Sequence, residues 1–158
     1  MDVRAVLAQW ATGVVVVTTI REDGTRHGMT ASSFTSVALE PPLVSVCLVS
    51  GGTTCRLVRR SGTFAVNMLA YDHRDIGRRF ADANSDPEDR FALGDWRTTA
   101  DGATVLGDAV AWLHCTVTGY HPAGDHTIVL GRVSAAATPR AAAPLIYHDR
   151  TYYEGIAR

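Results

Sequence analysis

The chain has 158 residues, of which 46% are hydrophobic and 20% are charged, as is usual for a globular domain and unlike a disordered chain. Its formal net charge is −1, whereas nucleic-acid binders of this size are usually basic, so we expect no nucleic-acid partner. Lysine is absent, which excludes mechanisms that depend on a catalytic lysine. The length predicts a single domain that spans residues 1–158.

The N-terminal residues and the cysteines indicate a reducing compartment. Residues 1–13 hold both an acid and a base and show no apolar run before a cleavage site, so we expect no secretory signal. The most apolar stretch, Gly13–Ile20, is too short for a membrane helix. Cys47, Cys55 and Cys115 form an odd set without CxxC spacing, which favours reduced thiols. We therefore expect a cytoplasmic protein without a membrane partner.

Apolar spacing predicts the elements in chain order. Val3, Leu7 and Trp10 recur at helical spacing, which predicts a helix over residues 2–11. Apolar and β-branched runs then predict strands, and two further amphipathic segments predict short helices. The strands are expected at 13–20, 26–34, 43–50, 63–70, twice within 109–133 around a turn at 120–125, and at 144–148 and 151–153; the helices follow the 50–54 loop and cover 71–81, and 82–96 is expected to be a surface loop with one helical turn.

This order of elements predicts a mainly β protein. Many short strands separated by turns, with two or three short helices, are typical of a β-barrel with helices around it. Strands do not alternate with long helices, and the chain has no GxGxxG fingerprint. A doubly wound dinucleotide-binding fold is therefore not expected.

Two polar segments are candidates for ligand binding. The run Thr30–Ser36 is small and hydroxylated, so it would let a flat ligand approach closely, although a polar edge strand explains the same residues. Ser50–Thr54 precedes a helix and has the composition of a phosphate cradle or of an ordinary N-cap. Arg78 and Arg79 would supply a matching cation, unless they only form a solvated helix end.

A third group combines two histidines and a carboxylate near one turn. His121, Asp125 and His126 are residue types that bind metals, but their spacing across a turn does not force them together. We favour two unrelated turn histidines and predict no metal site.

Taken together, these segments resemble the short-chain flavin reductase family, the reductase components of two-component flavin monooxygenases. The TASSF run and the GDH turn are the most specific features of the resemblance. The matching segments are ATGVVVVTT at 11–19, HGMTASSFTSV at 27–37, PPLVSVC at 41–47, FAVNML at 64–69, RFA at 79–81, RF at 90–91, GDHTIVLGRV at 124–133 and PLIYH at 144–148.

The resemblance implies a split β-barrel with short flanking helices, assembled as a homodimer with FMN or FAD near the subunit interface. Trp10, Trp96 and Trp112 are candidates for covering that interface. The family commonly has a serine where this chain has Gly51, which shifts the expected phosphate contacts to Thr53 and main-chain N–H groups.

The resemblance also implies roles for particular residues. The flavin-binding residues are expected to be Thr30, Ala31, Ser32, Ser33, Cys47, Ser50, Thr53, Thr54 and Arg79. Gly124, Asp125, His126 and Tyr147 are expected at the nicotinamide nucleotide, with His126 as the catalytic residue nearest to hydride transfer.

The function implied is an NAD(P)H:flavin oxidoreductase that reduces FMN or FAD with NADH or NADPH and supplies reduced flavin to a separate monooxygenase. Hydride transfer to a flavin needs no protein nucleophile, which suits a sequence without such a constellation. Two alternatives remain open. The domain would serve as a non-catalytic flavin-binding electron carrier, or as a flavoenzyme that keeps its flavin bound and reduces another substrate.

Overall fold

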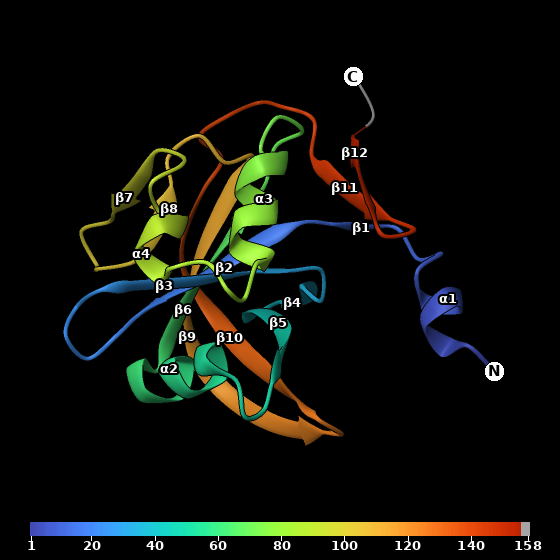
Figure 1. Ribbon diagram of the computed structural model, residues 1–158. Helices are drawn as coiled ribbons and strands as arrows, with labels where there is room; N and C mark the ends of the chain where they lie inside the picture. The colour runs from blue at the N-terminus through green and yellow to red at the C-terminus, as the bar shows by residue number, and fades with distance from the viewer. Residues whose placement is uncertain (156–158) are drawn as a thin grey trace.

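The computed structural model describes residues 1–155 as antiparallel strands with short helices around them (Figure 1). Residues 156–158 of the predicted 1–158 domain lie outside the described residues. The helices are α1 (Val3–Leu7), α2 (Thr53–Ser61), α3 (Arg74–Ala81) and α4 (Pro87–Arg90). The strands are β1 (Thr12–Gly13), β2 (Val15–Ile20), β3 (Arg26–Ala31), β4 (Thr35–Leu39), β5 (Pro42–Val49), β6 (Thr63–Met68), β7 (Trp96–Thr98), β8 (Thr104–Leu106), β9 (Ala111–Ala123), β10 (His126–Ala137), β11 (Leu145–His148) and β12 (Thr151–Glu154).

The main sheet has seven strands in the order β3-β2-β6-β9-β10-β5-β4, and β2 lies inside it. Val15 and Val17 of β2 belong to one buried apolar cluster, whereas Val14 and Val16 belong to a second cluster. A strand that is buried on both faces needs apolar residues at consecutive positions. This double burial explains the unbroken valine run in the sequence.

Two helices cover the two apolar clusters. Cys55 and Val58 of α2 pack into the first cluster, and Ile76 and Phe80 of α3 pack into the second, so the two helices lie on opposite sides of the sheet in Figure 1. Gly28 of β3 lies under α3, where a Cβ atom would approach the Phe80 ring to 2.8 Å. No helix within residues 1–155 is long and apolar enough to cross a membrane.

The hairpin of β9 and β10 is the longest pairing in the sheet and places the GDH segment. Gly124 and Asp125 form a two-residue turn, and Gly124 has a φ of 62°, a conformation that favours glycine at this turn position. The opposite edge of β10 pairs with β5, where His126 lies opposite Val49. The loop that follows β5 therefore lies beside the hairpin tip.

A serine side chain joins the connection between β3 and β4 to strand β5. β3 ends at Ala31 and β4 begins at Thr35, so the connection between them forms no strand. The Ser33 hydroxyl donates to the Cys47 carbonyl and accepts from the Cys47 N–H, both at 3.1 Å. One hydroxyl thus satisfies two main-chain groups of β5 beyond the end of β4.

The N-terminal predictions need correction. The first helix covers Val3–Leu7 rather than 2–11, and none of its residues is buried because it projects from the body of the molecule (Figure 1). The predicted strand 13–20 is divided, since Thr12–Gly13 pairs with β11 while β2 pairs with β3 and β6. The predicted strand 26–34 ends at Ala31.

Three strands were not predicted. β4 leaves four of its five residues exposed, so it lacks the alternation that marks a half-buried strand. β7 and β8 have three residues each, too few to show a period. The other predicted strands and the helix at 71–81 are present, with ends that differ by a few residues.

We expect Ser33→Ala to lower the free energy of unfolding by about 1–2 kcal/mol, because the N–H and the carbonyl of Cys47 both lose their partner. Urea denaturation measures this change. Ser32→Ala is the matched control, since the exposed Ser32 hydroxyl bonds to no described residue, and we expect a change below about 0.5 kcal/mol. Equal stability of the two variants would contradict the bridging role of Ser33.

Candidate functional site

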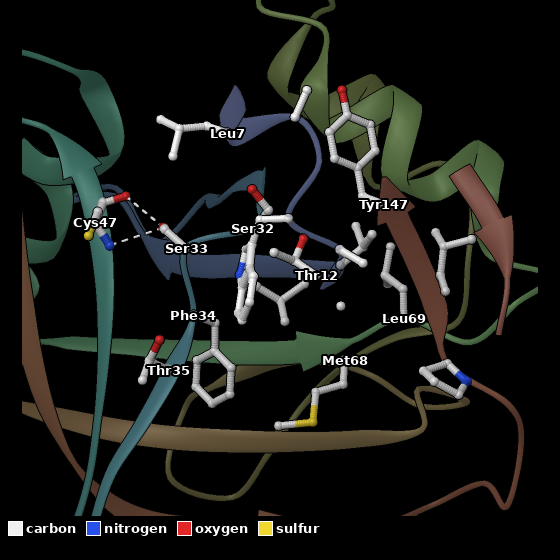
Figure 2. Close-up of a pocket in the computed structure, with 18 of the residues that line it drawn as sticks. Leu7, Thr12, Ser32, Ser33, Phe34, Thr35, Cys47, Met68, Leu69 and Tyr147 are labelled. Atoms are coloured by element: carbon white, nitrogen blue, oxygen red, sulfur yellow. Dashed lines mark hydrogen bonds between the residues drawn. The ribbon is translucent and has the colours of Figure 1, made fainter. Parts of the chain in front are cut away.

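A cavity of about 750 Å³ opens beside the connection between β3 and β4 (Figure 2). Its walls are mainly apolar and include Trp10, Phe34 and Met68. We call it the first cavity. Apolar and aromatic walls of this kind suit a flat ring system. The predicted site residues that line it are Ser32, Ser33, Cys47 and Tyr147.

The same cavity presents main-chain groups that the fold leaves available. Within residues 1–155, Ser32, Ser33 and Phe34 take part in no backbone–backbone hydrogen bond. The hydroxyl oxygen of Thr12, also in the lining, is buried and has no hydrogen-bond partner in the described part of the chain. Unpaired N–H and carbonyl groups beside apolar walls can bind the polar edge of a heterocycle. These residues fit a flavin ring.

A second cavity, of about 440 Å³, lies between β3, the start of α2 and the segment from α3 to α4. Thr30 lines this second cavity, and its hydroxyl donates to the Gly77 carbonyl of α3 at 2.6 Å. The predicted residues Thr53 and Thr54, at the start of α2, also line it. The lining further contains Arg21, His27 and Arg90, which the sequence analysis did not assign to a site, and no carboxylate. Basic and hydroxyl groups of this kind suit an anion.

Arg90 is the most buried charged group of the second cavity, with 8% of its surface exposed. Its guanidinium donates to the Gly28 carbonyl at 3.0 Å, to the Asp82 carbonyl at 2.8 Å and to the Ser85 hydroxyl at 2.8 Å. By contrast, Arg79 donates to the Asp89 carbonyl at 2.9 Å and lines neither cavity. Of the two arginines, Arg90 is the one whose charge reaches a cavity.

His27 connects an arginine with the start of α2. Arg21 can only donate, so its Nη2, 3.2 Å from His27 Nδ1, makes that ring nitrogen the acceptor. The other ring nitrogen, Nε2, then carries the proton and donates to the Thr54 hydroxyl at 2.9 Å. Burial, together with the smaller effects of the Arg21 and Arg90 charges, lowers the pKa of His27 from 6.5 to about 4. His27 is therefore neutral at neutral pH.

The GDH segment lies at the hairpin tip, outside the lining of both cavities. Asp125 accepts a hydrogen bond of 2.6 Å from His126 Nδ1, and this bond lowers the pKa of Asp125. The imidazole of His126 is 43% exposed, and its Nε2 makes no hydrogen bond to any residue within 1–155. Ser50 N–H donates to the Asp125 carbonyl at 3.0 Å, which joins the tip to the loop before α2. Ala31 is buried and lines neither cavity.

The histidines of the hairpin form no metal centre in the structure. His121 lies on β9 opposite Ile128, and no group of three or more His, Cys, Asp or Glu side chains within residues 1–155 is placed to hold a metal ion. The three cysteines form no disulfide, and burial raises the pKa of the Cys115 thiol to about 12. A thiol with such a pKa is unreactive at neutral pH.

The chain matches a protein-family model and several known proteins over most of its length. The model described as "Flavin reductase like domain" matches residues 7–155. The actinorhodin polyketide dimerase of Streptomyces coelicolor is 43% identical over 149 residues, which cover 94% of this chain and 82% of that protein. The reductase subunit HsaB of a flavin-dependent monooxygenase from Rhodococcus jostii is 38% identical, with 97% of this chain and 76% of the relative covered.

A solved structure gives the same result for the fold. The NADH:FAD oxidoreductase SgcE6 of Streptomyces globisporus, in complex with NAD and FAD fragments, is 35% identical and superposes with a TM-score of 0.88. The superposition covers 96% of this chain and 89% of that chain. The predicted mainly β, split-barrel fold with short flanking helices is confirmed.

We expect the stability of the protein to fall as the pH decreases from about 6.5 to about 4, in part because of His27. In this range the unfolded chain binds a proton at His27 that the folded protein does not bind, so the free energy of unfolding falls by up to about 1.4 kcal/mol per pH unit. His27→Gln keeps one donor and one acceptor but does not titrate. Urea denaturation across this pH range should show a shallower slope for the variant, and identical slopes would contradict the prediction.

Proposed function

Because the chain belongs to the flavin reductase-like domain family, we propose that it is an NAD(P)H-dependent flavin reductase that reduces FMN or FAD. One structural observation supports flavin binding by the TASSF segment, namely that the segment lines both cavities. Thr30 lines the second cavity, whereas Ser32, Ser33 and Phe34 line the first. Thr30 and Ser32 are two residues apart and therefore at most about 7 Å apart along the chain, so one ligand with a flat ring and a phosphate can reach both cavities.

The residues of this chain bind and orient the flavin rather than react with it. A bound flavin supplies the ring that accepts a hydride from the nicotinamide. The apolar walls of the first cavity exclude water from one part of the ring, and the main-chain groups of Ser32–Phe34 bind its polar edge. The hydroxyls of Thr53 and Thr54 bind the phosphate in the second cavity.

The hairpin tip is assigned to the nicotinamide nucleotide. Asp125 holds the proton of His126 on Nδ1, so Nε2 faces the nucleotide as an acceptor and the ring orientation is fixed. The contact between Ser50 and Asp125 couples this tip to the loop that leads to the flavin phosphate. Tyr147 in the first cavity is a further contact for the nucleotide.

The names of the relatives indicate which class of protein would be the partner of this chain. HsaB is named as the reductase subunit of a flavin-dependent monooxygenase. We propose that this chain likewise acts as a reductase component. Reduced flavin would leave it and reach a separate monooxygenase component. A cytoplasmic location, where the three free thiols stay reduced, belongs to the same proposal.

A homodimer is also part of the proposal. Helix α1 and the residues after it expose large apolar side chains, among them Val6 at 66%, Leu7 at 65% and Trp10 at 76%. Leu7 and Trp10 also line the first cavity. A second copy that covers α1 would bury these side chains and complete the wall of the cavity.

The test of the reductase function is anaerobic mixing of the protein with excess FMN or FAD and NADH, followed through the flavin absorbance. We expect many equivalents of flavin to be reduced per protein chain. His126→Ala should lower the rate of reduction about tenfold or more while the flavin Kd changes less than about twofold, because His126 orients the nucleotide and not the flavin.

The control variant is His121→Ala, which removes an exposed histidine from the same hairpin and should leave the rate unchanged. Reduction of a single bound equivalent would favour a flavoenzyme that keeps its flavin. Flavin binding without reduction by NADH or NADPH would favour the electron carrier. Either result would overturn the proposed reductase.

For the homodimer, light scattering coupled to gel filtration should give twice the 17.0 kDa mass of one chain. Val6→Glu places a charge in the exposed face of α1 and should return the mass to 17.0 kDa. Ile20→Glu makes the same change at an exposed apolar residue of β2 and should leave the dimer intact. A monomeric native protein that still binds flavin would overturn this part of the proposal.

A further inference from the structure

The second cavity contains a buried positive charge that no carboxylate within residues 1–155 neutralises. Arg90 is 8% exposed, and its three side-chain hydrogen bonds go to two carbonyls and one hydroxyl. Neutral acceptors satisfy N–H groups, but they leave the net charge of a guanidinium in place. Arg21 adds a second positive charge to the same lining. An anionic ligand group is the natural counterion for this cavity.

A hydroxyl group in this lining has one unused hydrogen-bond donor. Thr54 is 6% exposed, and its hydroxyl oxygen accepts the 2.9 Å hydrogen bond from His27 Nε2. Within residues 1–155 the Thr54 hydroxyl has no acceptor for its own proton. A hydroxyl that accepts one hydrogen bond directs its proton to another group. Because Thr54 lines the second cavity, a ligand bound in this cavity would accept the hydrogen bond from the Thr54 hydroxyl.

The position of the ring proton on His27 determines whether the Thr54 hydroxyl donates a hydrogen bond into the cavity. Arg21 Nη2 holds His27 Nδ1 as the acceptor, which leaves the ring proton on Nε2. With the opposite tautomer, Nε2 would accept from Thr54, and the hydroxyl would offer only lone pairs to the cavity. Lone pairs repel a phosphate, whereas an O–H group binds it. The Arg21–His27–Thr54 chain therefore selects a hydroxyl that donates to an anion.

We propose that His27 is a positioning residue for the flavin phosphate: it keeps the Thr54 hydroxyl as a donor to that phosphate, next to the charge of Arg90. The inference rests on the proposed flavin reductase function. His27 does not touch the reacting atoms, and it acts through Thr54 alone. The monophosphate of FMN and the diphosphate of FAD share the chemistry that this arrangement recognises.

The experiment compares FMN with riboflavin, which lacks the phosphate, as ligands of the full chain at pH 7.5. His27→Leu cannot donate to Thr54, so we expect its Kd for FMN to rise about tenfold while its Kd for riboflavin stays within about twofold. His27→Gln is the conservative rescue, since its amide can accept from Arg21 and donate to Thr54. This variant should keep FMN binding within about threefold of the native protein.

Thr54→Val tests the same contact without changing His27. It should show the same phosphate-specific loss, and adding His27→Leu to it should cause no further loss, because both substitutions remove one interaction. The proposal is overturned if Thr54→Val or a folded His27→Leu changes the Kd values for FMN and riboflavin by the same factor. It is also overturned if the two losses multiply in the double variant.

Two measurements distinguish a failure of this inference from a failure of the proposed function, and a flavin phosphate from a phosphate of the dinucleotide. Reduction of riboflavin by NADH tests the reductase function without the phosphate contact, so its absence would reject the function and leave the FMN to riboflavin ratio to decide on His27. A higher KM for NADH in His27→Leu, with riboflavin as acceptor and unchanged FMN affinity, would show that the anion belongs to the dinucleotide. That result would overturn the proposal.

Discussion

The register between β5 and β10 is the constraint on which the candidate site depends. It sets Val49 opposite His126, so that the loop after β5 begins with Ser50 bonded to the carbonyl of Asp125 at the hairpin tip. The same loop leads into α2, whose first turn carries Thr54 to the second cavity. A shift of one residue in this pairing would turn every side chain of the strand to the opposite face. One register therefore positions the proposed nucleotide and phosphate contacts together.

Much of the fold could be predicted from the sequence because local patterns and burial agree in the inner strands. The valine run of β2 is buried on both faces, and the predicted turn at 120–125 contains the two-residue turn of the long hairpin, although β9 continues to Ala123. The pattern did not show where a strand changes its partner. Thr12–Gly13 and β2 look continuous in sequence, but the first pairs with β11 and the second with β3 and β6. Such a division depends on chain segments more than a hundred residues apart.

The site was predictable in part, for a similar reason. Thr30, Ser32 and Ser33 stand in one recognisable run of the sequence, and in the structure this run borders both cavities. Arg90 was missed because its environment comes from tertiary contacts, among them the carbonyl of Gly28, 62 residues earlier. The predicted cation, Arg79, stands in a matching segment but lies at the surface of its helix. Sequence spacing indicates which residue types are present, whereas burial decides which charge faces a ligand.

The two cavities differ in how completely the chain itself builds their walls. In the second cavity the polar side chains come mainly from β3, α2, α4 and the turn before β3, so the proposed phosphate would meet a preformed set of donors. In the first cavity, Leu7 and Trp10 belong to an exposed segment that the rest of the chain does not cover. If a partner surface on α1 alters the proposed flavin affinity of this cavity, linkage requires flavin binding to alter that association by the same factor. Under the proposed function, the second cavity would therefore orient the phosphate from within one chain, whereas the wall around the ring would depend on what covers α1.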